Sequence, residues 1–404
     1  MRIVFVIVIV SLLSTSLSYA QTPGCTDPLA NNFEASATLN DGSCLYPPLT
    51  LSPTVSLEID DALSEISGMI CWNGFIWAHN DDTDTDVHRL EPAQADYIDA
   101  LALQGVANAD WEEISQDENY VYIGDFGNNV SGNRTDLKIL RIEKESLLQA
   151  SAQIDTIAFS YADQVDFSPQ NNNETNFDCE AFIVSEDSIY LFTKQWINFE
   201  TRVYALSKSP GEHIAEFKTS FDVNGLVTGA CYFENEQLLA LCGYSSNLLQ
   251  PFIYLLYDFT GQHFFSGNKR KVNIDLLIHQ IEGICSEDRL IWYLSNEHVV
   301  QKPFININAK LHTFNLENLL GDYLSTANAV SPLLQKSKVY CYPNPAVDFI
   351  TIHATQDSPC SIYSLSGTKI NCRKSSDNQI NVAHLLPGYY ILIIDNNSYI
   401  FNKL

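Results

Sequence analysis

Short apolar runs joined by polar turns are the main pattern along the middle of this chain. Residues 176–194 read NFDCEAFIVSEDSIYLFTK, in which the apolar runs 181–184 and 189–192 flank a Ser-Glu-Asp triplet. This pattern is typical of two short strands joined in a hairpin. The first strand begins with a charged residue, Glu180, and a charge at the start of an apolar strand requires an explanation.

The same pattern occurs five times, at residues 67–81, 112–126, 180–194, 228–244 and 282–296. Each hairpin opens on a polar residue, followed by a small or polar one and then a short apolar strand. We call these first residues the openers; they are Ser67, Glu112, Glu180, Thr228 and Glu282. Successive openers are 45, 68, 48 and 54 residues apart, and further strand-like runs follow most hairpins. Four strands per unit at such a period are typical of β-propeller blades.

The predicted fold class is therefore all-β, with a five-bladed β-propeller over residues 48–330 followed by a small C-terminal β-sandwich. Residues 310–319 supply a third strand for the last blade, and residues 54–60 supply its fourth, which closes the ring. A six-bladed ring would need another unit within residues 126–180, and we favour it less.

The N-terminal end carries two further segments. Residues 1–20 have a basic residue, an apolar core and a small-residue cleavage site, as in a secretory signal peptide. Residues 21–47 contain Cys25 and Cys44 with turn signals between them, which predicts a local disulfide contributing roughly 3 kcal/mol. Its polar residues either hold calcium or are solvated side chains of a small stapled module, and we favour the second. They are Asp27, Asn31, Asn32, Asp41 and Ser43.

Composition narrows the class of protein. Acidic residues outnumber basic ones by 49 to 22, which gives a net charge of −27. Such a surface repels nucleic acid and anionic lipid and suits divalent cations. After the signal peptide no apolar stretch reaches the length of a membrane span, and ten cysteines fit an exported protein. Among the propeller cysteines Cys71, Cys179, Cys231, Cys242 and Cys285, the odd number indicates that some are buried thiols.

The openers define a candidate metal site. In a propeller the first strand of each blade lines the central channel, so the five openers should meet at one axis. Three of them are carboxylates, and their mutual repulsion is relieved by a cation. Oxygen ligands without His or Cys select a hard ion, and calcium suits the expected size. The alternative is a water-filled channel in which the carboxylate pKa values are raised.

The order Ser67, Glu112, Glu180, Thr228, Glu282 resembles the calcium-dependent apyrases, exported five-bladed propellers that hydrolyse nucleoside di- and triphosphates. Residues 67–90, SGMICWNGFIWAHNDDTDTDVHRL, resemble the first blade of that family, and the openings are also similar to phytase-like and SdiA-regulated propellers. The resemblance implies that the five openers hold an axial calcium ion.

The chain also departs from the apyrase pattern. Residues 80–84 read NDDTD where the family has D-D-R-T-G, and only Lys194 is left as a phosphate contact. If the protein is an enzyme, it is a calcium-dependent phosphoric-ester or phosphoanhydride hydrolase with Asp81 or Asp82 as general base. His79 and His88 are more often structural in such a setting. The alternative is a non-catalytic surface module with a structural calcium and an unknown extracellular ligand.

The last segment, residues 338–404, resembles the type IX secretion sorting tail. The resemblance rests on Tyr-Pro-Asn-Pro at 342–345, Ser-Gly at 366–367 and Leu-Pro-Gly-Tyr-Tyr at 386–390. It implies recognition by the outer-membrane translocon and release or anchoring at the cell surface. The N-terminal GCTDP…DGSC segment is similar to a module of exported Bacteroidota proteins, which agrees with the same route.

Overall fold

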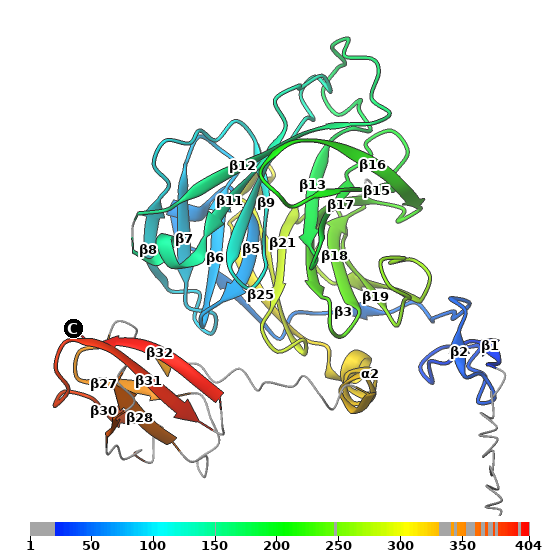
Figure 1. Cartoon of the computed structure of the whole chain (residues 1–404). Coiled ribbons are helices and arrows are strands. Elements are labelled where there is room, and N and C mark those ends of the chain that lie inside the picture. Colours follow the sequence, from blue (N-terminus) through cyan, green and yellow to red (C-terminus); the bar gives the residue numbers. More distant parts are fainter. Residues whose placement is uncertain are drawn as a thin grey trace, which may run out of the picture. The chain divides into compact units, whose positions relative to one another are not determined.

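The computed structural model divides the chain into two compact units, Met1–Asp322 and Tyr323–Leu404, which we describe separately (Figure 1). The structure describes residues 21–149, 151–245, 249–330, 341–342, 346–352, 360–364, 368–370, 375, 379–394 and 397–403. The predicted signal peptide, residues 1–20, lies outside the described residues.

In the described part of the first unit, most strands pair into five antiparallel groups of four, which we call blades 1 to 5. Blade 1 consists of β5 (Ile66–Trp72), β6 (Phe75–Asn80), β7 (Asp86–Leu90) and β8 (Tyr97–Ala102). Blade 2 consists of β9 (Trp111–Gln116), β10 (Tyr120–Asp125), β11 (Lys138–Glu143) and β12 (Ile154–Tyr161). Blade 3 consists of β13 (Cys179–Val184), β14 (Ser188–Thr193), β15 (Thr201–Ser207) and β16 (Gly211–Phe221).

Blade 4 consists of β17 (Leu226–Phe233), β18 (Leu238–Tyr244), β19 (Pro251–Tyr257) and β20 (Asn268–Ile274). Blade 5 consists of β21 (Ile281–Ser286), β22 (Ile291–Asn296), β25 (Lys310–Asn315) and β4 (Val55–Glu58). Blades 2 and 3 join into one eight-stranded sheet through parallel pairing of β12 with β16. The short strand β3 (Thr50–Leu51) adds to blade 4 beside β20.

The five first strands form a closed cycle, because β5 contacts β9, β9 contacts β13, β13 contacts β17, β17 contacts β21 and β21 contacts β5 (Figure 1). The cycle closes through the N-terminal strand β4, whose Val55 to Glu58 pair with Thr313 to Lys310 of β25. Residues 54–60 thus supply the fourth strand of the last blade, as predicted. Residues 162–178 contain no strand.

Burial on both faces explains the composition of the inner strands. All six residues of β13 and of β21 are buried, because neighbouring blades pack against both of their faces. Strands in that position read as continuous apolar runs rather than as an alternation. Tryptophans fill the spaces between sheets, and Trp77, Trp111 and Trp292 are fully buried. The predicted all-β class is confirmed.

The N-terminal module docks on blade 4. Its strands β1 (Pro23–Gly24) and β2 (Leu39–Asn40) pair in parallel, and Cys25 and Cys44 form the predicted disulfide. Asp27 Oδ2 accepts hydrogen bonds from the Tyr46 hydroxyl at 2.7 Å and from the Tyr257 hydroxyl of β19 at 2.5 Å. Asp27, one of the residues considered as calcium ligands, is therefore buried in the contact between the module and blade 4.

Two other residues considered as calcium ligands, Asn32 and Asp41, bond within the turns of the module. Asn32 Oδ1 accepts the Leu45 N–H at 2.7 Å, and its Nδ2 donates to the Ser43 carbonyl. Asp41 Oδ1 accepts the Ser43 N–H at 3.0 Å. These contacts favour the stapled module over a calcium loop.

Helices are few in the described residues. α1 (Lys144–Leu148) follows β11, and η1 (Asp61–Leu63) is a single 3₁₀ turn before β5. α2 (Glu317–Val330) follows β25, where the sequence pattern predicted no helix. The hairpin strands β23 (Val299–Gln301) and β24 (Ile305–Ile307) lie between β22 and β25.

The second unit is a small β domain with two sheets in its described residues. One sheet contains β26 (Cys341–Tyr342), β27 (Phe349–Ile352) and β30 (Gln379–Asn381). The other contains β28 (Cys360–Ser364), β29 (Lys369–Ile370), β31 (Gly388–Ile394) and β32 (Asn397–Lys403). Fully buried residues such as Ile350, Ile362 and Phe401 form one core. The predicted C-terminal β domain is confirmed.

Candidate metal centre

Every opener lies at a β-bulge. In each blade the pairing between the first and second strands skips one residue of the first strand, or two in blade 1. The skipped residues are Ser67 with Gly68, Glu112, Glu180, Thr228 and Glu282. A bulge leaves its residue outside the ladder and redirects the side chain. The polar residue at the start of each apolar strand is therefore a bulge residue, and the same bulge occurs in all five blades.

Four of the five openers line one cavity of about 210 Å³. They are Ser67, Glu112, Glu180 and Glu282. The cavity is strongly acidic, because its lining includes six carboxylates: Asp81, Asp110, Glu112, Glu180, Glu282 and Glu297. Lys194 is the one lysine or arginine among the described lining residues.

Three carboxylates form the tightest cluster. Oxygen atoms of Glu112, Asp178 and Glu180 lie within 4.8 Å of one another, and all three residues are buried. Asp178 Oδ1 accepts the N–H of Asn128 at 2.6 Å, and its Oδ2 accepts the indole N–H of Trp196 at 2.7 Å. These two bonds fix the orientation of Asp178.

Lys194 supplies the positive charge of the cavity. Its ammonium group donates a hydrogen bond to Glu180 Oε2, and both side chains are buried. It also lies 4.7 Å from the ring centre of Trp196 and 5.2 Å from that of Tyr244. Although burial opposes its charge, Glu180 holds the pKa of Lys194 well above the usual value. The residue expected to contact phosphate is therefore bonded to an opener.

Burial raises the pKa of most cavity carboxylates. It raises the pKa values of Glu112, Glu180 and Glu282 above the ordinary range for glutamate. Three other lining residues also have raised pKa values, with burial as the largest cause and neighbouring carboxylates adding to it. The pKa is about 7 for Asp81, about 6 for Asp110 and about 9 for Glu297. Gathering carboxylates in a buried space therefore raises the pH at which they ionise.

The two hydroxyl openers bond to neighbouring strands. Ser67 Oγ donates to the backbone carbonyl of Glu112 at 2.5 Å, and Thr228 Oγ1 donates to the carbonyl of Ile281 at 2.6 Å. Ser67 lines the cavity, whereas Thr228 is not among its lining residues. The structure therefore brings four of the predicted ligands together and leaves Thr228 outside the lining.

A second layer of the axis is built around Glu113, which is fully buried. Its Oε2 accepts the N–H of Ala230 from blade 4 at 2.7 Å, and its Oε1 accepts the N–H of Ile114. The equivalent residues after the other openers are small: Gly68, Ala181, Gly229 and Gly283. A Cβ on Gly68 or on Gly229 would meet the Glu113 carboxylate. The Glu113 side chain therefore occupies space that is open because residues 68 and 229 are glycines.

The predicted general bases lie in different places. Asp81 lines the cavity, whereas Asp82 is exposed and accepts the N–H of Asp84 at 2.7 Å. Neither histidine of this blade is among the lining residues. His79 is fully buried, which lowers its pKa to about 4, and His88 Nε2 lies 2.7 Å from Asp84 Oδ2.

Sequence reasoning missed the acidic residues two positions before the openers. Asp110 precedes Glu112 and Asp178 precedes Glu180 at this spacing, and Gln280 precedes Glu282. A polar residue at this position in several blades is a signal in the sequence that could have found them. Asp110 and Gln280 line the cavity, and Asp178 belongs to the carboxylate cluster with Glu112 and Glu180.

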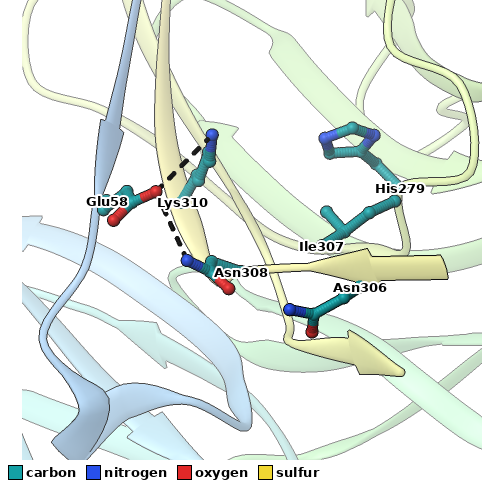
Figure 2. A pocket seen from close by; sticks show the side chains of 6 residues that line it. All are labelled: Glu58, His279, Asn306, Ile307, Asn308 and Lys310. Carbon is teal, nitrogen blue, oxygen red and sulfur yellow. Dashed lines mark hydrogen bonds and ion pairs between the residues drawn. The ribbon is translucent and has the colours of Figure 1, made fainter.

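A second cavity, of about 320 Å³, lies where β4 pairs with β25 (Figure 2). Its polar side chains neutralise each other: Glu58 Oε1 accepts from Asn308 Nδ2 at 3.3 Å and lies 4.0 Å from Lys310 Nζ. His279 stands apart from these contacts in Figure 2. This cavity contains no opener and offers no comparable cluster of carboxylates.

Residues 340–404 match the family described as "Secretion system C-terminal sorting domain". The predicted sorting tail is thereby confirmed over residues 340–404, close to the expected 338–404. The domain supports delivery by type IX secretion to the cell surface or the medium. Among the described residues, no helix has the length and apolar character that a membrane crossing requires.

Comparisons of the whole chain are more distant. One similar structure is PorZ, a surface component of the type IX secretion system of Porphyromonas gingivalis, with 12% identity and a TM-score of 0.31. The match covers 84% of this chain and 45% of PorZ, so this chain spans less than half of that protein. Another is the computationally designed Ika4 protein, with 9% identity, a TM-score of 0.26, and coverage of 53% and 99%. No curated protein matches the chain. The resemblance to apyrases and SdiA-regulated propellers is not supported by these comparisons.

The layer around Glu113 predicts a large effect for a single methyl group. In Gly229→Ala the new Cβ would lie 2.5 Å from the Glu282 carbonyl oxygen and 2.9 Å from Cys242 Sγ. We expect the free energy of unfolding to fall by at least about 2 kcal/mol, measured by urea denaturation. The matched control is Gly321→Ala in α2, whose nearest neighbour would be 3.5 Å away and which should be neutral or stabilising. Equal effects of the two variants would contradict the close packing of the axis.

Proposed function

We propose that this protein is a surface or secreted binding module, delivered by type IX secretion, whose axial cavity binds a hard divalent cation. Calcium is the candidate ion. The observation that carries the proposal is the cluster of Glu112, Asp178 and Glu180, in which three buried carboxylates lie within 4.8 Å of one another. The five-bladed propeller interpretation, in which these residues face the axis, belongs to the same proposal.

The electrostatic cost of this cluster supports the proposal. At an effective dielectric constant of about 20, two unit charges separated by 4.8 Å repel by about 3 kcal/mol. Three ionised carboxylates make three such pairs, and Lys194 compensates only part of that repulsion. A divalent ion would remove the remainder and would allow all three groups to ionise at neutral pH.

The chemistry of the donors favours calcium over softer metals. The lining offers carboxylate, hydroxyl and amide oxygens, with no sulfur or imidazole among its described residues. Such sets suit calcium, which accepts six to eight oxygen ligands in a flexible geometry. Glu112, Asp178 and Glu180 would hold the ion. Glu282 of blade 5 would be available as a further ligand. The ion would compete with Lys194 for Glu180.

Hydrolysis of phosphate compounds is the second candidate, and Asp81 is the observation in its favour. A carboxyl group with a pKa of about 7 at the cavity suits a general base. The surroundings oppose it, because phosphoryl transfer needs cationic groups around the phosphates. Arg134, on the loop after β10, is bonded to Asp125 and Asp136, and Lys194 is bonded to Glu180. We therefore favour the binding module.

Calcium binding should depend on the opener and on the competing lysine. In calorimetric titrations of the chelator-treated full chain, we expect Glu180→Gln to weaken binding about tenfold or more, because one charged ligand is lost. Lys194→Met should strengthen binding, because the competing cation is removed. Glu186→Gln, on the exposed turn of the same hairpin, is the matched control and should bind like the wild type. Identical affinities in all four proteins would exclude this site.

Stability without the ion should depend on pH in a defined direction. Asp81, Asp110 and Glu297 have folded pKa values of about 7, 6 and 9, above the ordinary 3.8, 3.8 and 4.5. A raised folded pKa contributes stability that is fully present below the ordinary pKa and lost as pH rises through the folded value. In chelator, the melting temperature should therefore fall between about pH 4 and pH 9. Millimolar calcium should reduce this fall, and a fall unaffected by calcium would contradict the proposal.

Catalysis is tested by calcium-dependent release of phosphate from ADP, GDP and UDP. We expect no release above that of Glu180→Gln, because the acidic cavity repels the phosphates. Turnover that is lost in Asp81→Asn but retained in Asp82→Asn would instead establish the hydrolase. Calcium binding and turnover are measured separately, so failure of one leaves the other interpretable.

A further inference from the structure

Two cysteines meet at the junction where the ring of blades closes. Cys71 lies on β5 of blade 1 and Cys285 on β21 of blade 5, and these inner strands are in contact. Their Sγ atoms are 3.0 Å apart, although the residues are separated by 214 positions in the sequence. This distance is shorter than an ordinary contact between unbonded sulfur atoms and about 1 Å longer than a disulfide bond.

The other buried thiols of the propeller behave differently. Cys179 Sγ lies 3.5 Å from the Ala181 carbonyl, and Cys242 Sγ lies 3.7 Å from the Glu282 carbonyl. These contacts are those of small side chains packed against backbone. The pair formed by Cys71 and Cys285 is therefore distinguished by its geometry and not merely by burial.

The route of the protein supplies the conditions for oxidation. The sorting domain at residues 340–404 implies export, and disulfides form and persist in exported proteins. The N-terminal module already contains one, between Cys25 and Cys44. Cys71 and Cys285 belong to the same exported chain as that disulfide, so they encounter the same oxidants.

We propose that Cys71 and Cys285 form a disulfide that covalently closes the ring between blades 1 and 5. The oxidant is a disulfide compound, either an oxidised dithiol protein of the export route or a small disulfide. The Cys71 thiolate attacks one sulfur of that disulfide, which releases one thiol and leaves a mixed disulfide on Cys71. The Cys285 thiolate then attacks the Cys71 sulfur, forms the new bond and releases the second thiol. Two cysteine thiols are oxidised, and one external disulfide is reduced to two thiols.

Accessibility assigns the order of these steps. Cys71 is partly exposed, whereas Cys285 is 1% exposed, and burial raises the pKa of its thiol. The accessible thiol meets the oxidant, and the buried one completes the bond within the protein. Cys231 of β17 is the third thiol in this neighbourhood, because it interacts electrostatically with both members of the pair. It is the competing partner that the experiment must separate.

Peptide mapping separates all three cysteines. Cleavage after glutamate, which does not occur at the Glu91–Pro92 bond, places Cys71 in peptide 66–112, Cys231 in 217–234 and Cys285 in 283–287. The full chain is incubated with oxidised glutathione, blocked with N-ethylmaleimide under denaturing conditions, cleaved and analysed by mass spectrometry without reduction. We expect peptides 66–112 and 283–287 joined, with the loss of two hydrogen atoms. The peptides ending at Glu34 and Glu58, joined through Cys25 and Cys44, are the internal control for oxidation.

Two outcomes overturn the proposal. One is N-ethylmaleimide on both Cys71 and Cys285 while the internal control is oxidised. The other is a bond from either residue to Cys231. A joined pair that separates on reduction supports it.

Thermal stability gives a second, independent measurement. Cys71→Ala and Cys285→Ala should each lower the melting temperature of the oxidised chain by roughly 5–10 °C. The double variant should lower it little further, because both changes remove the same bond. Cys242→Ala is the matched control, and its effect should add to that of Cys71→Ala. Additive effects of Cys71→Ala and Cys285→Ala would contradict a shared bond.

Discussion

The first unit depends on one constraint: the bulged inner strands of five blades bring an excess of carboxylates to a single buried cavity. Six acidic side chains and one lysine line that space, and burial raises the pKa of each opener carboxylate. Buried charges of one sign persist only when protons, an internal cation or a bound ion compensate them. The structure shows two of these, the raised pKa values and Lys194. A bound ion, the third means of compensation, would explain why the protein keeps so unfavourable a cluster.

The inner strands keep the cavity apart from the packing between blades by using two layers. Four of the five openers line the cavity, while the residues that follow the openers form the next layer, where the blades touch. In that second layer Glu113 bonds to the backbone of blade 4 and fits only because Gly68 and Gly229 carry no side chain. Two adjacent glutamates, Glu112 and Glu113, thus have different roles. The bulge decides which of them faces the cavity and which binds the neighbouring strands.

The hairpin pattern predicted the first two strands of each blade and the closing role of residues 54–60, because inner strands buried on both faces read as short apolar runs. The outer strands β7 and β8 of blade 1 were not predicted. The pattern also placed four openers in one cavity, since equivalent positions of repeated units converge. It could not show that Thr228 turns to the Ile281 carbonyl or that Lys194 bonds to Glu180, because these contacts join residues of distant or facing strands. The helix α2 was missed, because its amphipathic pattern is weak beside the neighbouring strands.

The ring of blades is most easily opened where its two ends meet. All five junctions between blades are crossed by the chain, since β4 of blade 5 leads directly into β5 of blade 1. The ring is closed instead inside blade 5, where the four residues of β4 pair with β25 from the other end of the ring. The net charge of −27 opposes compaction throughout the ring, and β4 and β25 are strands of one blade that are far apart in the sequence. Contacts that join the ends of the ring therefore contribute more to its integrity than equivalent contacts elsewhere. The N-terminal module extends the same strategy, because its Asp27 binds Tyr257 and so fixes the segment that leads into β4.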